Sequence, residues 1–289
     1  MTGVSPTLRT EAEAAVMRAQ AYILSRQSAP GGFCFYRSGP VDEPNLRDTY
    51  HAVAALTLLG AMVPAADRIV DFVCGRRTFD SGFLYWYAFT LDRLGCADAI
   101  DATRRARIRD LTIDVPKPGQ VDMAQRLTRA LRAARLLSRF GQLPEGRGVR
   151  DALDALKLGG GYGTEPNLTD TSRALGIRHC FGALMDSDDT RAFVDRMQVP
   201  PFGFALTENA RTGTLEVIHA GVRCCALLGL PLRRSGEVLR FVLACQTKDG
   251  GFAPAPVALP DLAQTHRALV VIRSLVSGHS GTAMPAVPP

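Results

Sequence analysis

Two short segments of the chain carry nearly the same residues and the same chemically competent side chains. EPNLRDT covers residues 43–49 and EPNLTDT covers residues 165–171, and in each a carboxamide precedes a carboxylate by three positions. A carboxylate in such a place can transfer a proton, or bind Mg²⁺ together with a diphosphate. It can also cap a helix that begins at Asp-Thr by accepting backbone N–H bonds. Asp48 and Asp170 are therefore candidate catalytic residues, with helix capping as the open alternative.

The polar residues around these aspartates would suit an anionic ligand. Asn45 and Asn167 can donate hydrogen bonds, and Arg47 and Arg173 can neutralise a diphosphate. We take these four as candidate substrate-binding residues. On exposed helix faces the same arginines would simply be solvated, which leaves the assignment open.

Three of the five histidines occur early in apolar stretches with helical periodicity: His51, His219 and His266. Histidines gathered there could act as a general base, hold a metal, or bind a diphosphate through Mg²⁺. We take His51 and His219 as catalytic candidates and His266 as a substrate-binding one. The alternative is that each imidazole only bonds to a neighbouring loop.

A further acidic motif, DSDDT, covers residues 186–190. A carboxylic acid kept protonated by its neighbours can protonate an alkene, so Asp186, Asp188 and Asp189 form an alternative acid. The motif follows one helical stretch and opens the next, TRAFVDRM, where acidic residues commonly cap a helix and complement its dipole. We therefore favour capping for these three residues.

Aromatic residues fall into two groups. Tyr85, Trp86 and Tyr87 are expected to open a helix and to contact an apolar substrate. Six others lie in glycine-containing turns: Phe33, Phe35, Tyr36, Phe202, Phe204 and Phe252. Packing between repeats is the favoured interpretation of the turn aromatics. One Trp and 7% aromatic residues are few for a cavity that steadies a multi-ring carbocation.

Helical periodicity runs through most of the chain and indicates an all-α fold. HAVAALTLLG, QRLTRALRAARLLSRFG and EVLRFVLACQ all place apolar residues at i, i+3, i+4 and i+7. Glycine–aromatic turns recur, and their second glycines are Gly32, Gly82, Gly161, Gly203 and Gly251. The 79-residue interval between Gly82 and Gly161 fits two units, so six helix pairs of about 44 residues are expected. The third pair, around residues 96–141, has lost its glycines.

These repeats resemble those of protein prenyltransferase β subunits and of squalene and oxidosqualene cyclases, over about residues 15–275. GGF…EPNLRDTYHAVAALTLLG, GGYGTEPNLTDTSRAL and CQTKDGGF…PDLAQTHRAL carry the resemblance. It implies an α6/α6 toroid over residues 1–276, with a flexible tail at 277–289. The second helix of each pair would be the inner one. The starts of the inner helices would then meet at one mouth of a central cavity. The partial positive charge of these helix N-termini would suit a diphosphate, and the apolar body of the cavity would suit an isoprenoid chain.

The family contains zinc-dependent prenyltransferases and acid-initiated cyclases, and we compare the residues that each reaction needs with this sequence. The zinc ligands of the prenyltransferases correspond to Asp170, Ser172 and Gln264, so two of three are lost, zinc is not expected, and no metal ligand is assigned. The acid of a cyclase DxDD motif falls on Arg47 or Thr169. We therefore expect a terpene-cyclase-like isomerase or lyase with a non-standard acid. No cofactor is assigned, and Mg²⁺ bound together with a diphosphate stays open. Two alternatives stay open: a zinc-independent prenyltransferase acting on a small molecule or peptide, and a non-catalytic isoprenoid-binding or scaffold protein.

The composition limits which partners and which cellular location we expect for the protein. The 289 residues are 46% hydrophobic, without a run of about 18 apolar residues, so no membrane span is expected. The net charge of +6 comes almost entirely from arginine, in a usage typical of bacteria, and no basic run is dense enough for nucleic acid. The seven cysteines form no CxxC pair and are expected to be buried free thiols. No signal sequence is seen, so we expect a cytoplasmic protein, with a partner subunit or a homo-oligomer left open.

Overall fold

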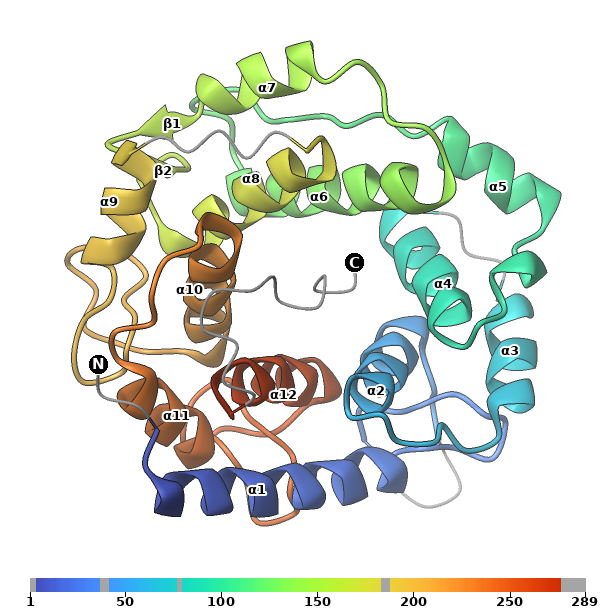
Figure 1. Ribbon diagram of the computed structural model, residues 1–289. Helices are drawn as coiled ribbons and strands as arrows, with labels where there is room; N and C mark the ends of the chain where they lie inside the picture. Colours follow the sequence, from blue (N-terminus) through green and yellow to red (C-terminus); the bar gives the residue numbers. More distant parts are fainter. Residues whose placement is uncertain (1–3, 37–41, 77–79, 183–187, 277–289) are drawn as a thin grey trace. The chain divides into compact units, whose positions relative to one another are not determined.

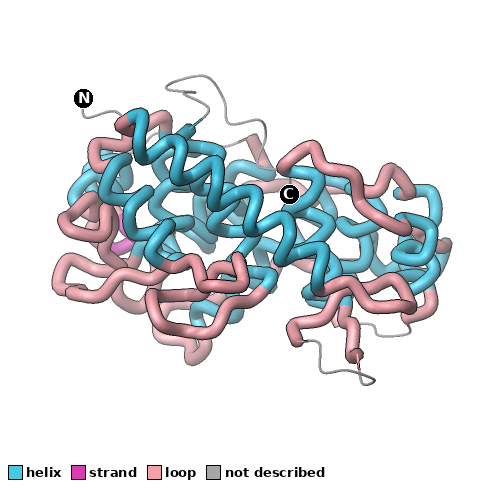
Figure 2. Tube along the Cα trace, turned by 90° about the horizontal axis from the view of Figure 1, so that it is seen from below, coloured by secondary structure: helices cyan, strands magenta, loops and turns pink. Residues whose placement is uncertain are grey.

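The structure is a computed structural model that describes residues 4–36, 42–76, 80–182 and 188–276. Within those residues, twelve α-helices follow one another with only a short 3₁₀-helix and one pair of two-residue strands between them. The helices are α1 (Pro6–Ser25), α2 (Leu46–Leu58), α3 (Ala66–Cys74), α4 (Ser81–Arg93), α5 (Ala102–Arg109), α6 (Met123–Phe140), α7 (Arg147–Asp154), α8 (Leu168–Cys180), α9 (Asp188–Arg196), α10 (Leu215–Leu228), α11 (Ser235–Ala244) and α12 (Leu262–Val276). Figure 2, coloured by secondary structure, shows how little strand there is. The predicted all-α class and its six helix pairs are confirmed, with odd-numbered helices first and even-numbered helices second in each pair.

The chain divides into two compact units, which we describe separately. The terminal unit holds residues 4–104 and 239–276, so it brings together the first and last helices of the chain. The middle unit holds residues 105–238. The 3₁₀-helix η1 (Ala97–Ala99) belongs to the terminal unit, and the antiparallel strands β1 (Lys157–Leu158) and β2 (Gly161–Tyr162) belong to the middle unit.

Second helices pack side by side in the terminal unit. α2 lies between α12 and α4, and the first helices α1 and α3 cover this row on one side (Figure 1). The long helix α1 packs against both α12 and α2, so the last helix pair is joined to the first. Alanines dominate the buried face of α2 from Ala52 to Ala55, and such small side chains allow close helix approach.

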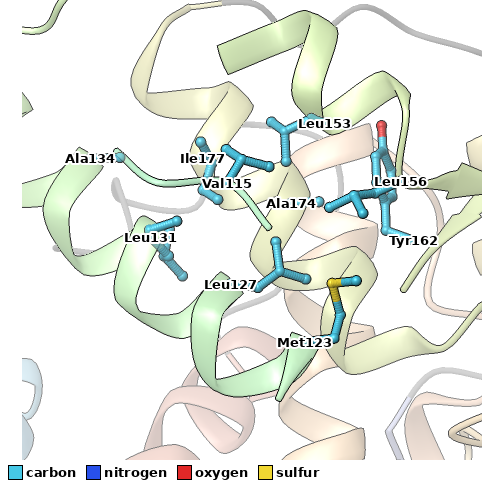
Figure 3. Packing of buried hydrophobic residues seen from close by; sticks show 11 residues of the cluster. Val115, Met123, Leu127, Leu131, Ala134, Leu153, Leu156, Tyr162, Ala174 and Ile177 are labelled. Carbon is cyan, nitrogen blue, oxygen red and sulfur yellow. The ribbon is translucent and has the colours of Figure 1, made fainter. Parts of the chain in front are cut away.

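The middle unit repeats the arrangement with α8 between α6 and α10. Its core is formed by Leu127 and Leu131 of α6, Leu153 of α7, and Ala174 and Ile177 of α8, which point toward one another in Figure 3. Burying a leucine side chain stabilises a fold by about 2 kcal/mol, so these contacts hold α7 against the second helices.

Glycine turns in the first, fourth and sixth helix pairs pack against the first helix of the next pair, which for the sixth pair is α1. At three turns a Cβ on the second glycine would come within 2.6–2.8 Å of an aromatic ring: Gly32 against Phe72, Gly161 against Phe193 and Gly251 against Tyr22. The ring occupies the place of a side chain, so glycine is required there. The turn aromatics Phe33, Phe204 and Phe252 are completely buried, which confirms their predicted packing role, whereas Phe35 and Tyr36 are exposed.

One of the expected turns differs in the structure. Residues 81–83 were predicted to form a glycine–aromatic turn, but they begin α4, because the Asp80 side chain accepts hydrogen bonds from the backbone N–H groups of Gly82 and Phe83. The third pair, α5 and α6, lacks a glycine turn as predicted. α6 follows Asp122, which adopts a left-handed conformation and makes no side-chain cap.

All seven cysteines are free thiols, as predicted; Cys34, Cys224, Cys225 and Cys245 are buried and the other three are partly buried. Among the described residues, no helix combines the length and apolar character needed to cross a membrane. The predicted flexible tail at 277–289 lies outside the described residues.

Candidate functional site

The two matching segments form the same local structure at the starts of α2 and α8. Asn45 is the N-cap of α2: its Oδ1 accepts from the backbone N–H of Asp48 at 2.9 Å, and its Nδ2 donates to Asp48 Oδ2 at 2.7 Å. Asn167 and Asp170 repeat both bonds at 2.9 Å. The prediction that Asp48 and Asp170 are the caps is therefore wrong, and each helix begins at the leucine before them. A carboxamide both donates and accepts, so it caps the helix and holds the aspartate at once.

Asp170 is tied into an ion-pair chain of the middle unit. Arg173 donates from Nη1 to Asp170 Oδ1 at 2.7 Å and from Nη2 to Glu216 Oε1 of α10 at 3.0 Å. Asp170 is only 4% exposed, so the guanidinium compensates a carboxylate that has little access to water. The predicted substrate-binding residue Arg173 thus has two carboxylate partners already.

Asp48 is held differently in the terminal unit. It is 6% exposed, and burial raises the pKa of its carboxyl above the usual 3.8, with a smaller contribution from the nearby Asp261. Hydrogen bonds from Asn45 and from the backbone N–H of Phe35, and the charge of Arg47, oppose this rise in pKa. Burial has the largest effect, so the protonated acid is favoured more strongly at Asp48 than in water.

A cluster of rings lies next to Asp48 on the same helix and its neighbours, and we call it the ring cluster: Tyr50 and His51 of α2, Tyr85 and Phe89 of α4, and His266 of α12. The Tyr50 ring lies edge-on to those of His51, Tyr85 and His266, with centroids 5.0, 5.5 and 6.3 Å away. Tyr85 also packs on Phe89 at 4.7 Å. His51 follows Asp48 by three positions, which places both side chains on one face of α2.

Two histidines meet inside this cluster. Nδ1 of His51 lies 3.2 Å from Nδ1 of His266, a hydrogen bond that requires one nitrogen to carry the proton and the other to accept it. Burial, with the charges of Arg93 and Arg267, lowers the pKa of His266 to about 3. His266 is therefore neutral near pH 7, which lets the two imidazoles stay this close.

The start of α12 adds an amide to this part of the terminal unit. Gln264 occupies the same position after its N-cap, Asp261, that Asp48 occupies after Asn45, and its backbone N–H donates to Asp261 Oδ1 at 2.6 Å. The side chain is 8% exposed, and its Oε1 is buried without a hydrogen-bond partner. A ligand with a hydrogen-bond donor would satisfy this oxygen.

The other predicted site residues are dispersed. Tyr87 faces η1, where its hydroxyl donates to Ala99 O at 3.4 Å, whereas Trp86 is partly exposed and lies edge-on to Phe83. Arg47 is exposed and His219 of α10 is partly exposed. All three Tyr85–Tyr87 residues lie inside α4 rather than at its start.

The acidic motif DSDDT begins α9 as predicted. Asp188 and Asp189 are exposed in its first turn, and Asp189 lies 3.8 Å from the Lys157 ammonium. Asp186 lies outside the described residues. Within the described part of the chain, no three or more His, Cys, Asp or Glu side chains are placed to hold a metal ion together.

Sequence reasoning missed two members of the site. Tyr50 makes three of the ring contacts, and Arg93 of α4 lies with its Cζ 5.9 Å from the Tyr50 ring centroid. Tyr50 could have been suspected from its place between Asp48 and His51. Nothing in the local sequence marks Arg93, because the ring that it contacts belongs to an earlier helix of the chain.

Solved structures show where the fold has been seen before. A variant of the type II terpene cyclase MstE from Scytonema, in complex with the substrate geranylgeranyl dihydroxybenzoate, matches with a TM-score of 0.62 at 12% identity, covering 93% of this chain and 98% of that one. Another variant of the same enzyme, in complex with the product merosterolic acid A, gives a TM-score of 0.60 at 12% identity, covering 93% of this chain and 97% of that one. At this identity the likeness concerns the fold.

Comparison of the sequence with family models also identifies this fold. No curated protein matches the chain. The family model described as the prenyltransferase alpha-alpha toroid domain matches residues 3–84 and 79–280. That match takes in all of the described helices. The chain therefore belongs to the prenyltransferase alpha-alpha toroid domain family, and its fold is an all-α toroid of helix pairs.

Proposed function

We propose that this protein is a terpene-cyclase-like enzyme that starts its reaction by protonating a prenyl chain from Asp48. The observation that carries the proposal is the buried Asp48 carboxyl, whose pKa is raised and which lies on the same face of α2 as His51 of the ring cluster. A catalytic acid must keep its proton until the substrate is in place, and burial does this for a carboxyl group. The likeness in fold to a type II terpene cyclase supports the same reaction class.

The proposed chemistry assigns a role to each part of the site. The Asp48 O–H adds its proton to one carbon of a double bond, leaving a carboxylate on Asp48 and a cation on the chain. The next double bond attacks that cation, and a ring forms. Tyr50, Tyr85 and Phe89 present aromatic faces that stabilise a passing cation by about 1–2 kcal/mol each when water is excluded.

A cyclised cation must finally lose a proton. His266 is neutral near pH 7, and we assign it as the base that accepts that proton. The product would then be an isomer of the substrate with any head group retained. Substrates of interest are geranylgeranyl and farnesyl diphosphates and, from the ligand of the Scytonema enzyme, geranylgeranyl dihydroxybenzoate.

The test incubates purified protein with each of these three compounds, with and without Mg²⁺, and follows products by mass spectrometry. Asp48→Asn is the decisive variant, and Asp170→Asn is its matched control, because both aspartates are held by an equivalent asparagine. Loss of a general acid should slow turnover by about 10²–10⁴-fold. We expect this for Asp48→Asn only, with substrate still raising its melting temperature.

Other outcomes would overturn the proposal. Normal turnover by Asp48→Asn would remove Asp48 from the chemistry. Pyrophosphate release that requires a second acceptor would identify a prenyltransferase instead. Tight binding of all prenyl compounds without any product would favour a non-catalytic isoprenoid-binding protein.

A further inference from the structure

One polar side chain of the terminal unit is left unsatisfied at the start of α12. Gln264 is 8% exposed, and its Oε1 is buried and accepts no hydrogen bond from any residue that the structure describes. A buried acceptor without a donor destabilises a fold, and most buried polar atoms in proteins are paired. The Gln264 oxygen therefore points to a hydrogen-bond donor that the described protein does not itself supply.

The residue that caps α12 explains why this oxygen has no partner. At the starts of α2 and α8 the cap is an asparagine, whose Nδ2 donates to the side chain three residues later. At α12 the cap is Asp261, which accepts from the backbone N–H of Gln264 and has no side-chain N–H to give. Gln264 thus occupies the position of Asp48 and Asp170 without the donor that both of them receive.

Gln264 and Asp48 lie at about the same level of two neighbouring helices. α12 packs along α2 (Figure 1), and Nδ1 of His51 lies 3.2 Å from Nδ1 of His266. Asp48 precedes His51 by three residues, and Gln264 precedes His266 by two. The charge of Asp261 at the cap of α12 also contributes to the raised pKa of Asp48. The unpaired oxygen therefore belongs to the same part of the terminal unit as the proposed acid.

We propose that Gln264 is a specificity-determining residue whose Oε1 accepts a hydrogen bond from a hydroxyl group near the reacting double bond of the prenyl substrate. The inference rests on the function proposed for Asp48 and names the class of compound, a prenyl alcohol or a prenylated phenol. The terminal torsion of a glutamine is broad, so the carboxamide can turn its oxygen toward such a hydroxyl. An ionised diphosphate offers only acceptors and would leave this oxygen unpaired, which makes prenyl diphosphates the poorer ligands.

Calorimetry on the wild-type protein tests the assignment with matched pairs of saturated compounds, which have no double bond to protonate and so report binding alone. Phytanol is compared with its methyl ether, and phytanyl dihydroxybenzoate with the form in which both phenol groups are methylated. Within each pair only the donor is lost. We expect the hydroxyl form of one pair to bind about tenfold more tightly, and the pair that shows this preference separates the alcohol from the phenol.

Two variants of Gln264 link the preference to this oxygen. Gln264→Leu removes the acceptor, and it should bring the affinities within that pair to less than about twofold of each other. Gln264→Glu keeps an acceptor oxygen at the same distance from the backbone and should still prefer the hydroxyl form. The melting temperature of each variant without ligand shows that it is folded.

Three results would overturn the assignment: equal affinities within both pairs, a preference for the hydroxyl that Gln264→Leu retains, or no binding of any of the four compounds. The turnover assay with Asp48→Asn tests the proposed reaction separately. Product formation that depends on Asp48, together with equal affinities within both pairs, would leave that reaction standing and remove Gln264 from recognition. A hydroxyl preference that depends on Gln264, without product from any unsaturated compound, would keep the recognition and remove the reaction.

Discussion

The starts of α2 and α8 share sequence, cap and hydrogen bonds, yet they hold their aspartates in different electrostatic surroundings. Both use an asparagine to cap the helix and to hold the aspartate three residues later. At α8 the third residue after the aspartate is Arg173, which pairs with Asp170 and reaches Glu216. At α2 the same position is His51, whose ring bonds to His266 instead.

The difference teaches that one position decides the chemistry of the whole segment. An arginine three residues on gives a buried carboxylate its counter-charge, and the aspartate becomes part of the fold. With a histidine there, the desolvation of Asp48 outweighs the hydrogen bonds and charge that oppose it, and its pKa rises. The repeat supplies the same scaffold twice, and the residue three positions after the aspartate gives Asp170, but not Asp48, an arginine partner on its own helix.

The largest expected effect comes from giving Asp48 an arginine three residues later, as Asp170 has in Arg173. His51→Arg would place a guanidinium beside Asp48 and lower the pKa of that carboxyl, so a smaller fraction of the acid should carry its proton at any given pH. Turnover of the prenyl substrate should fall by about 100-fold, the lower end of what a general acid contributes. Steady-state kinetics and titration of Asp48 by carbon NMR measure the two effects. His51→Gln removes the imidazole without adding charge, and an equal fall in turnover for that variant would show that charge is not the cause.

The second effect concerns stability at α8. Arg173→Met leaves the carboxylate of Asp170 buried without its partner, and we expect a loss of about 3 kcal/mol in the free energy of unfolding. His51→Met at the equivalent position of α2 breaks one hydrogen bond between imidazole rings and should cost about 1 kcal/mol. Urea unfolding of both variants measures the contrast. Similar losses would contradict the assignment of Asp170 to the fold.

The third effect is a pH dependence that belongs to the terminal unit. The pKa of His266 is about 3 in the folded protein and near 6.5 when unfolded, so the unfolded chain takes up a proton first as the pH falls. The stability that His266 contributes is therefore complete above about pH 6.5 and should decline by about 1.5 kcal/mol between about pH 6.5 and pH 5. Protonation of Asp48, whose folded pKa is raised, acts in the opposite direction at lower pH. His266→Gln should flatten the profile in that range, and an unchanged slope would exclude His266 as its source.

The smallest expected effect is a gain in stability from a substitution at Gln264. Gln264 stands at the third position of α12, as Asp48 and Asp170 do in their helices, but its Oε1 is buried without a partner. Gln264→Leu removes that unsatisfied oxygen while keeping the backbone bond to Asp261, so we expect a gain of about 1 kcal/mol in stability. Thermal unfolding measures it. If the amide contacts substrate, affinity should fall in the same variant, and a loss of stability would show that the amide has a structural role after all.

Some of these features follow from local sequence. Glycine–aromatic turns, apolar residues at helical spacing and the EPNLxDT segments predict helix pairs, because each depends on neighbours within a few residues. The helix starts were misplaced by two residues, since asparagine and aspartate are both good caps and only the folded backbone shows which one is used. The turn predicted at Gly82 failed for a related reason: Asp80 caps α4 just before it.

By itself, the sequence determined the helix pairs and their repeat, because these are properties of short segments. Only the tertiary structure decided which asparagine or aspartate caps each helix, which aspartate gains a counter-charge and which histidines meet. Glu216 is 43 residues from Arg173, and His266 is 215 residues from His51. Burial and charge at these positions come from helices that are distant in the chain, and no local pattern records which of them will pack together.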